Sequence, residues 1–197
     1  MTTPSQTDPT LTIELVAHMD AGDRRLWAGD QDVRPLSELG RGQAARAAEA
    51  LAVRPIDAFY SSPALRCRQT LAPLAARFGL PVVVVPDLRE TDGFPAPAGW
   101  TRPPWAAADE CPDPHGGAYA AGRAWSAVRQ IRAMSPVGRV AVCTHGDIVP
   151  CLIAFLVGAE RLSPPPALVW RGGWYTISIA ASKVEVQHHE APSDFPR

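Results

Sequence analysis

Lysine is almost absent from this chain. Of its 197 residues only Lys183 is a lysine, and arginine supplies nearly all of the positive charge. The 19 Lys and Arg residues are offset by 20 Asp and Glu residues, which gives a formal net charge of −1. A chain without a cationic surplus lacks the long-range field that attracts nucleic acids and anionic membranes. We therefore expect neither among its partners, and any anion site must be formed locally.

Long apolar runs and paired cysteines are also missing. No stretch approaches the ~20 apolar residues of a membrane span, and residues 1–10 lack the basic start and apolar run of a signal peptide. Cys67, Cys111, Cys143 and Cys151 form no C-x-x-C pair and show no zinc-like spacing with histidine. We expect a cytoplasmic protein with free thiols, a short disordered leader over 1–10, and neither a metal nor a cofactor.

The chain does contain a regular alternation of two kinds of segment. Runs of apolar and β-branched residues predict strands, whereas apolar residues at helical spacing predict helices. Strands are expected at 11–17, 56–62, 81–86 and 138–144, and helices at 40–54, 63–79, 118–134 and 147–158. This order predicts an α/β fold, a three-layer sandwich in which helices flank a mostly parallel central sheet. We expect a single domain over 11–190.

Several details of this prediction depend on single residues. Pro63 suits the first position of the second helix, and Gly79 suits its C-cap. The segment 81–86 predicts a buried strand because it is almost entirely valine, and the last helix is expected to end at Gly158. The tail predicts a β-hairpin with its turn at Gly172–Gly173.

Residues 92–117 are rich in proline, glycine and tryptophan, which predicts an irregular insertion. An insertion of this length inside a compact domain is usually functional. We expect it to act as a lid over a pocket, with Trp100 and Trp105 against the substrate. The tail hairpin or an exposed tryptophan could mediate association, so a monomer or a homodimer is expected.

Reactive side chains follow the predicted strands. His18, Ser62, Glu90 and His145 come after the first, second, third and fourth strands, and Arg66 lies about one helical turn beyond Ser62. The carboxyl ends of parallel strands share one edge of a sheet, where ligands bind in such folds. We therefore expect these five side chains to converge on one rim.

Residues of these types suit phosphoryl transfer. An imidazole such as His18 is largely unprotonated near neutral pH and can act as a nucleophile. Arg66 could hold phosphate oxygens with its guanidinium fork, and His145, if protonated, would add a second cation. Glu90 could protonate the leaving oxygen. Because no acidic cluster is present to hold magnesium, we expect the reaction to be independent of metal.

Four segments in this order carry a family resemblance. "LVAHMDAGDRRLWAGDQDVRPLSELGRGQA", "SPALRCRQT", "LRETDG" and "VCTHGDIV" together resemble the histidine phosphatase superfamily, whose fold is that of phosphoglycerate mutase. The first segment is most similar to that of small bacterial phosphohistidine phosphatases. The matches extend from residue 11 to about residue 157.

The resemblance implies a role for each matching residue. His18 would form a phosphohistidine intermediate, and Glu90 would supply the acid. Arg66, with Ser62 before it, would bind phosphate, and His145 and Gly146 would complete the site. The expected substrate is a small phosphorylated molecule or a phosphoprotein that carries a phosphomonoester or a phosphohistidine.

The first motif departs from the family pattern. Ala17 stands where the family has an arginine before the nucleophile, and Met19 stands where it has a glycine or an alanine. We expect Met19 to add bulk at the mouth of the site. Losing one preorganised donor to the transferred group costs ~10²–10³ in rate. Arg24 or Arg25 could fold back and replace the missing guanidinium.

Two alternatives to such a compensated phosphatase remain open. The site could bind an anionic ligand with little turnover. It could also have been recruited to acid–base chemistry that is not phosphate hydrolysis, with His18, Glu90 and His145 retained for proton transfer. Fold alone does not decide between these alternatives.

Overall fold

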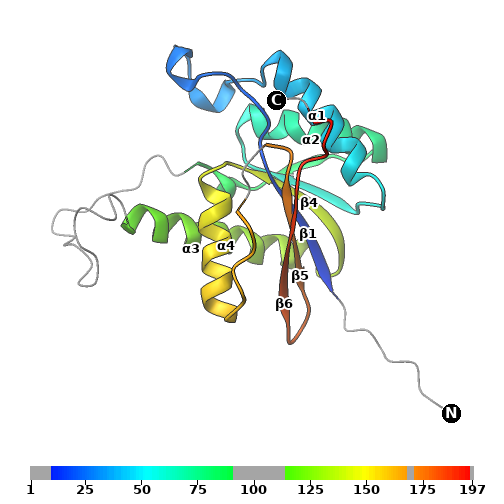
Figure 1. The fold of residues 1–197 in the computed structure, drawn as a ribbon, viewed down its shortest axis with the longest axis vertical. Helices are drawn as coiled ribbons and strands as arrows, with labels where there is room; N and C mark the ends of the chain where they lie inside the picture. Colours follow the sequence, from blue (N-terminus) through cyan, green and yellow to red (C-terminus); the bar gives the residue numbers. More distant parts are fainter. Residues whose placement is uncertain (1–9, 91–113, 168–170, 196–197) are drawn as a thin grey trace.

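The sheet is built around β1 (Leu11–Ala17), an apolar strand with buried side chains on both of its faces. The computed structural model describes residues 10–90, 114–167 and 171–195 (Figure 1). β1 pairs in parallel with β4 (Gly138–Thr144) and antiparallel with β5 (Trp174–Ile179). A strand flanked on both sides and covered on both faces has no polar surface to present, which explains its near-continuous apolar sequence.

The remaining strands extend the sheet on both sides of this central pair. They are β2 (Ala58–Ser61), β3 (Val82–Val84) and β6 (Val184–His189), and the order in the described part of the chain is β3-β2-β4-β1-β5-β6. β2 is parallel to both β4 and β3, whereas β6 is antiparallel to β5. The predicted mostly parallel sheet is therefore confirmed.

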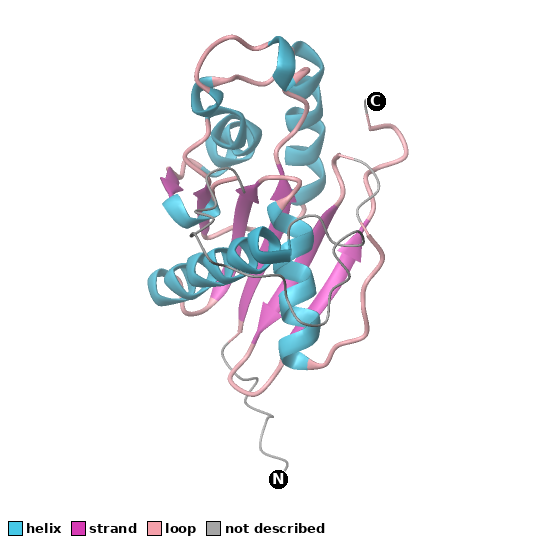
Figure 2. Cartoon of the chain, turned by 90° about the vertical axis from the view of Figure 1, so that its left-hand side faces the viewer, coloured by secondary structure: helices cyan, strands magenta, loops and turns pink. Residues whose placement is uncertain are grey.

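Helices cover both faces of this sheet (Figures 1 and 2). They are α1 (Glu38–Leu51), α2 (Leu65–Phe78), α3 (Pro114–Met134) and α4 (Ile148–Glu160). Short 3-10 turns η1 (Arg24–Leu26) and η2 (Gln31–Val33) lie between β1 and α1, and η3 (Pro86–Leu88) follows β3. α1 and α2 pack on one face and α3 and α4 on the other. This arrangement is the predicted three-layer sandwich. No helix in the described ranges is long and apolar enough to cross a membrane.

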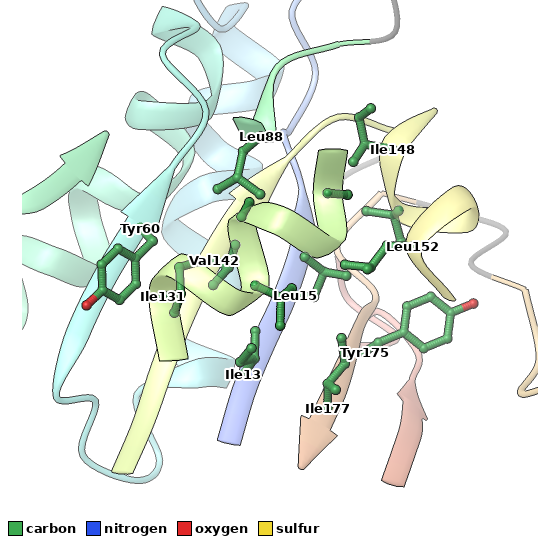
Figure 3. Packing of buried hydrophobic residues seen from close by; sticks show 14 of the residues in the cluster. Ile13, Leu15, Tyr60, Leu88, Ile131, Val142, Ile148, Leu152, Tyr175 and Ile177 are labelled. Carbon is green, nitrogen blue, oxygen red and sulfur yellow. The ribbon is translucent and has the colours of Figure 1, made fainter. Parts of the chain in front are cut away.

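The two cores follow from alternation along the strands. Leu15 and Val142 point toward α3 and α4, where they meet Ile131 and Leu152 (Figure 3). Their strand neighbours, including Val16, point to the opposite face and pack with α1 and α2. Burial of such aliphatic side chains contributes ~1.5–3 kcal/mol each, which fixes the register of the central strands.

Helix α1 shows how closely periodicity predicts a buried face. Its buried positions include Gln43, Ala44, Ala47, Ala48 and Leu51, the five residues that repeat at helical spacing in the sequence. The helix ends before the predicted stop at residue 54.

Four local predictions were wrong. β3 lies at the edge of the sheet and its valines are half-exposed, so 81–86 is not a buried strand. α2 begins at Leu65 rather than at Pro63, although Gly79 does cap it with a left-handed φ of 65°. α4 passes through Gly158 to Glu160. The hairpin turn lies between β5 and β6, so Gly172–Gly173 precede the hairpin instead of closing it.

The predicted lid and leader lie mostly outside the described residues. The structure does not describe 91–113, which include Trp100 and Trp105, or 1–9. The end of the predicted insertion belongs to α3.

Candidate active site

Three parallel strands end at one rim and place the site there. His18 directly follows β1, Ser62 follows β2 and His145 follows β4. The backbone N–H of His18 donates to the Thr144 carbonyl at 2.9 Å, and that of Ser62 donates to the Cys143 carbonyl at 2.9 Å. Because these bonds continue the sheet ladder by one residue, the backbone that carries His18 and Ser62 is held by the sheet.

The two imidazoles lie side by side at this rim. The ring centroids of His18 and His145 are 5.4 Å apart, with the ring planes at 77°. His18 is 7% exposed and His145 is 1% exposed. The structure thus brings together two histidines that are separated by most of the chain.

The hydrogen bond of His18 fixes which ring nitrogen carries the proton. Its Nδ1 lies 2.7 Å from the carbonyl oxygen of Met19, and a carbonyl oxygen can only accept. The neutral ring therefore carries its hydrogen on Nδ1 and keeps the lone pair on Nε2. Within the described part of the chain, no hydrogen bond engages Nε2.

His145 has the opposite arrangement. Arg66 Nη2 lies 3.2 Å from its Nδ1, and a guanidinium can only donate, so Nδ1 accepts. The hydrogen then lies on Nε2, which donates to Ser62 Oγ at 2.8 Å. This ring is fixed at both nitrogens by two of the predicted site residues.

Both histidines are neutral in this environment. Burial, opposed by the bond to Met19 and reinforced by the nearby guanidinium groups of Arg171, Arg66 and Arg34, lowers the pKa of His18 to about 4. Burial and the charge of Arg66 lower the pKa of His145 to about 3. His18 is therefore unprotonated near neutral pH. A bound dianion beside either ring would favour the protonated form.

Arg66 occupies the first turn of α2 and is 1% exposed. Its Nη1 donates to the Gln31 carbonyl at 2.5 Å, and its Nη2 donates to Glu90 Oε2 at 2.8 Å as well as facing His145. Its Nε is buried and has no hydrogen-bond partner among the described residues. A buried N–H of this kind is a donor that an anion could satisfy.

Glu90 connects the buried and the accessible parts of the site. Besides its bond to Arg66, its other oxygen lies 3.8 Å from Arg24 Nη1. Arg24 is 57% exposed, whereas Arg25 is 84% exposed and pairs with Asp23 at 2.7 Å. Of the two arginines considered as replacements for the residue at position 17, only Arg24 contacts another predicted site residue.

A cavity of about 770 Å³ opens at this rim. Its wall includes the predicted residues His18, Arg24, Glu90 and Gly146. Arg66, His145 and Ser62 are not among its lining residues. Arg66 contacts the wall from the buried side through Glu90, and His145, which bonds Ser62, lies against His18. Trp105 lies outside the described residues. In the described ranges, no group of three or more His, Cys, Asp or Glu side chains is placed to hold a metal ion.

Two arginines of the cavity wall were not predicted as site residues. Arg34 is nearly buried, and its Nη1 donates to the Ala21 carbonyl at 2.7 Å. Arg171 precedes β5, and its Nη1 donates to the carbonyl oxygens of His18 at 2.6 Å and Met19 at 3.1 Å. Arg34 lies within the first of the four quoted segments, in "RPLS", so the family resemblance could have pointed to it. Arg171 could have been found if β5 had been placed antiparallel beside β1, since its beginning then lies at the site rim.

The expected position of Met19 was wrong. Its side chain is fully buried and packs with Leu36, Ala44 and Phe195 below the rim, so it adds no bulk at the mouth. Its backbone N–H donates to Thr70 Oγ1 at 3.0 Å. Position 19 therefore holds the turn after His18 in place instead of narrowing the site.

Known proteins resemble this chain in sequence and in fold. The profile of the histidine phosphatase superfamily (branch 1) matches residues 18–191. An 8-oxo-(d)GTP phosphatase of Mycolicibacterium smegmatis is 24% identical over 185 residues, which cover 94% of this chain and 49% of the relative. This chain thus spans about half the length of that curated relative.

Solved structures show the same fold. A mycobacterial glucosyl-3-phosphoglycerate phosphatase aligns with a TM-score of 0.64 at 22% identity, over 93% of this chain and 99% of that protein. The protein histidine phosphatase SixA in complex with tungstate aligns with a TM-score of 0.58 at 19% identity, over 91% of this chain and 96% of that protein. Since the family profile covers most of the sequence, this chain belongs to the histidine phosphatase superfamily.

Proposed function

We propose that the protein is a phosphatase that transfers a phosphoryl group from a phosphomonoester or a phosphohistidine to His18 Nε2. The observation that carries this proposal is the hydrogen bond from His18 Nδ1 to the Met19 carbonyl. It leaves the lone pair on Nε2 of a residue that lines the cavity. The lowered pKa of His18 keeps that nitrogen unprotonated near neutral pH.

Arginines would stabilise the negative charge of the transferred phosphoryl group. Arg24, Arg34 and Arg171 line the cavity, and Arg66 adds a fourth guanidinium behind Glu90. Preorganised cations of this kind stabilise the equatorial oxygens of a phosphoryl group during transfer. We therefore propose that the reaction needs no metal.

The reaction would proceed in two balanced steps. In the first, Glu90 accepts a proton from the incoming phosphate monoanion, and His18 Nε2 attacks phosphorus and forms an N–P bond. The bond to the leaving group, an ester oxygen or the ring nitrogen of a phosphohistidine, breaks, and the carboxyl proton of Glu90 moves to that leaving atom. In the second, water attacks phosphorus, the N–P bond breaks, and a proton of the water returns to Glu90. An arriving phosphoryl oxygen would compete with Glu90 for Arg66, which releases the carboxyl group for this role.

The remaining wall suits an organic leaving group. Val149, Pro150, Ala167 and Tyr175 line the side of the cavity formed by α4 and the segments around β5. Apolar side chains beside a few charged groups are typical of sites for small organic molecules. The names of the relatives suggest three substrate types for a first panel, namely a nucleotide, a sugar phosphate and a phosphohistidine peptide.

One observation favours a second candidate, an anion-binding protein with little turnover. Both terminal nitrogens of Arg66 are already held by protein acceptors, Gln31 and Glu90, and position 17 is an alanine. A guanidinium that must break these hydrogen bonds before it can bind phosphate is less well preorganised than a guanidinium without protein partners.

One experiment separates the two candidates. Hydrolysis of p-nitrophenyl phosphate is followed in the presence of a chelator for the native protein, His18→Gln and Ala17→Arg, with an unfolding curve for each variant. The phosphatase proposal expects native hydrolysis that His18→Gln abolishes. Orthovanadate binding without native hydrolysis, together with activity gained in Ala17→Arg, would instead establish the anion-binding protein. Hydrolysis that needs an added divalent ion would refute the metal-free reaction.

A further inference from the structure

The end of β1 carries no cationic side chain next to His18, although a bound phosphoryl group would need one. Ala17 lines the cavity immediately before His18, and its methyl group can neither donate a hydrogen bond nor carry charge. A phosphoryl group on His18 Nε2 would nevertheless need cations around its oxygens. Arg66 approaches from α2 and is held by Gln31 and Glu90.

The topology brings another arginine to this position. β5 runs antiparallel to β1, with Trp174 paired to Val16. The residues just before β5 therefore lie beside the carboxyl end of β1, at the rim that carries His18. Arg171, three residues before Trp174, lines the cavity there.

We propose that Arg171 binds the transferred phosphoryl group and replaces, from another strand, the arginine that position 17 lacks. This inference rests on the proposed phosphatase function and names a further substrate-binding residue for it. Its Nη1 donates to the carbonyl oxygens of His18 and Met19 at 2.6 and 3.1 Å. The same atom is 3.3 Å from His18 Nδ1, which already donates to Met19, so the ring and the guanidinium are in contact without a hydrogen bond between them.

These contacts leave most of the guanidinium available. All hydrogen bonds of Arg171 within the described part of the chain involve Nη1. The two Nη2 hydrogens and the Nε hydrogen remain as donors for phosphate oxygens, in the fork geometry that arginine offers. Arg171 is thus anchored by one nitrogen to the residue that would carry the phosphoryl group.

The backbone beside Arg171 has a conformation that glycine favours, and it packs closely against Phe195. Gly172 has a φ of 92°, which disfavours residues with a Cβ atom, and a Cβ there would overlap the ring of Phe195. Phe195 is itself buried against Met19 and Leu36. The turn after His18 and the segment before β5 therefore share one packing cluster, which sets the position of Arg171 relative to His18.

Arg24 is less suited to this role. Like Arg171 it is exposed, but its described ion pair is with Glu90 at 3.8 Å. It reaches the cavity from η1, whereas Arg171 contacts His18 directly. Arg34 also lines the cavity, but its Nη1 and Nε are held by Ala21, Gly22 and Gln31.

The test compares Arg171→Gln, Arg171→Lys and the double variant Ala17→Arg/Arg171→Gln. Arg129→Gln is the control, because Arg129 is exposed on α3. kcat and KM for p-nitrophenyl phosphate, the Kd for orthovanadate and the free energy of unfolding are measured for each. Loss of one preorganised donor predicts a ~10²–10³-fold lower kcat/KM for Arg171→Gln. We expect a smaller loss for Arg171→Lys, weaker orthovanadate binding by both, and partial rescue by Ala17→Arg in the double variant.

The outcomes separate this inference from the function on which it rests. If His18→Gln abolishes hydrolysis but Arg171→Gln leaves kcat/KM and orthovanadate affinity unchanged, the phosphatase stands and the role of Arg171 is refuted. If the native protein does not hydrolyse the ester, the phosphatase proposal fails, and orthovanadate affinity alone decides whether Arg171 holds the anion. A loss in Arg171→Gln without any rescue by Ala17→Arg, and with lowered stability, would show a structural role and overturn the inference.

Discussion

Gly40 in α1 lies so close to the backbone carbonyl of Asp20 that a Cβ atom at position 40 would overlap that oxygen. Asp20 belongs to the turn that follows His18. Its backbone N–H donates to Gln43 Oε1 at 2.9 Å, and its carbonyl accepts from the Ser37 N–H at 3.0 Å. The first turn of α1 therefore supports the loop beneath the proposed nucleophile, and only glycine permits that approach.

Two glycines of α1 offer a matched pair for testing this contact. In Gly40→Ala the backbone must shift, and we expect a loss of ~1–3 kcal/mol, as for other overpacked sites. Gly42 is exposed, and a Cβ atom at position 42 would meet no atom within 4 Å, so Gly42→Ala should stabilise the helix by ~0.4–1 kcal/mol. Urea unfolding measures both. Equal effects from the two substitutions would contradict the close approach.

The buried neutral histidines predict how stability depends on pH. In the unfolded chain His18 has a pKa near 6.5, whereas in the folded protein burial lowers it to about 4. Between these values the unfolded state binds more protons, so the free energy of unfolding falls as the pH decreases from 6.5 toward 4. A difference of this size is worth up to ~3 kcal/mol.

Replacement of His18 isolates its share of this effect. His18→Gln should lose stability less steeply than the native protein over the same pH range, while His145, whose pKa is lowered to about 3, continues to contribute. Urea unfolding at a series of pH values gives both slopes. Parallel curves for the two proteins would show that His18 is not buried in its neutral form.

Ser62 and its neighbour Ser61 allow the orientation of His145 to be tested. Ser62 Oγ lies 2.8 Å from His145 Nε2, whereas Ser61 Oγ donates to the Ser62 carbonyl at 2.9 Å and does not contact the ring. Ser62→Ala leaves a buried ring N–H with only the weak acceptor Cys67 Sγ at 3.6 Å, and the loss of the hydroxyl acceptor costs ~1–3 kcal/mol. We expect Ser62→Ala to lower kcat and to shift the His145 ring resonances in NMR spectra. Ser61→Ala should leave those resonances in place, and equal perturbation by both variants would argue against the assigned hydrogen bond.

Gly172 and Phe195 should show coupled effects. Gly172→Ala introduces both a strained φ of 92° and a clash with the Phe195 ring. Phe195→Ala removes the clash but leaves the strain, so the double variant should be more stable than the sum of the two single losses implies. A thermodynamic cycle from urea unfolding measures this coupling. Strict additivity would mean that the ring does not press on position 172.

Much of the fold could be predicted from local pattern. The buried face of α1 follows from its alanine spacing, and β1 follows from its uninterrupted apolar residues. β3 was wrongly expected to be buried, because a run of valines has the same pattern at the centre and at the edge of a sheet. The turn of the tail hairpin was misplaced because two adjacent glycines such as Gly172–Gly173 are typical of a tight turn. In the structure Gly172 instead makes room for the ring of Phe195, a contact that local sequence does not reveal.

Some residues of the candidate site could be predicted from local sequence, and others could not. His18, Ser62, Arg66, Glu90 and His145 could be brought together from the sequence, since each follows a parallel strand or lies just beyond one. Arg171 could not, because its place beside His18 depends on the antiparallel pairing of β5 with β1. The buried position of Met19 likewise depends on tertiary packing, whereas Arg25 is engaged locally by Asp23, two residues before it.

His18 Nε2 is the proposed carrier of the phosphoryl group. Phosphohistidine is labile in acid and stable in base, so the protein is mixed briefly with an aryl phosphate, quenched in alkali, digested and analysed by mass spectrometry. We predict a phosphorylated peptide with the group on His18 that is present in the native protein and absent in His18→Gln. Hydrolysis of the ester with no phosphate on His18, or with the group on His145 instead, would contradict the mechanism.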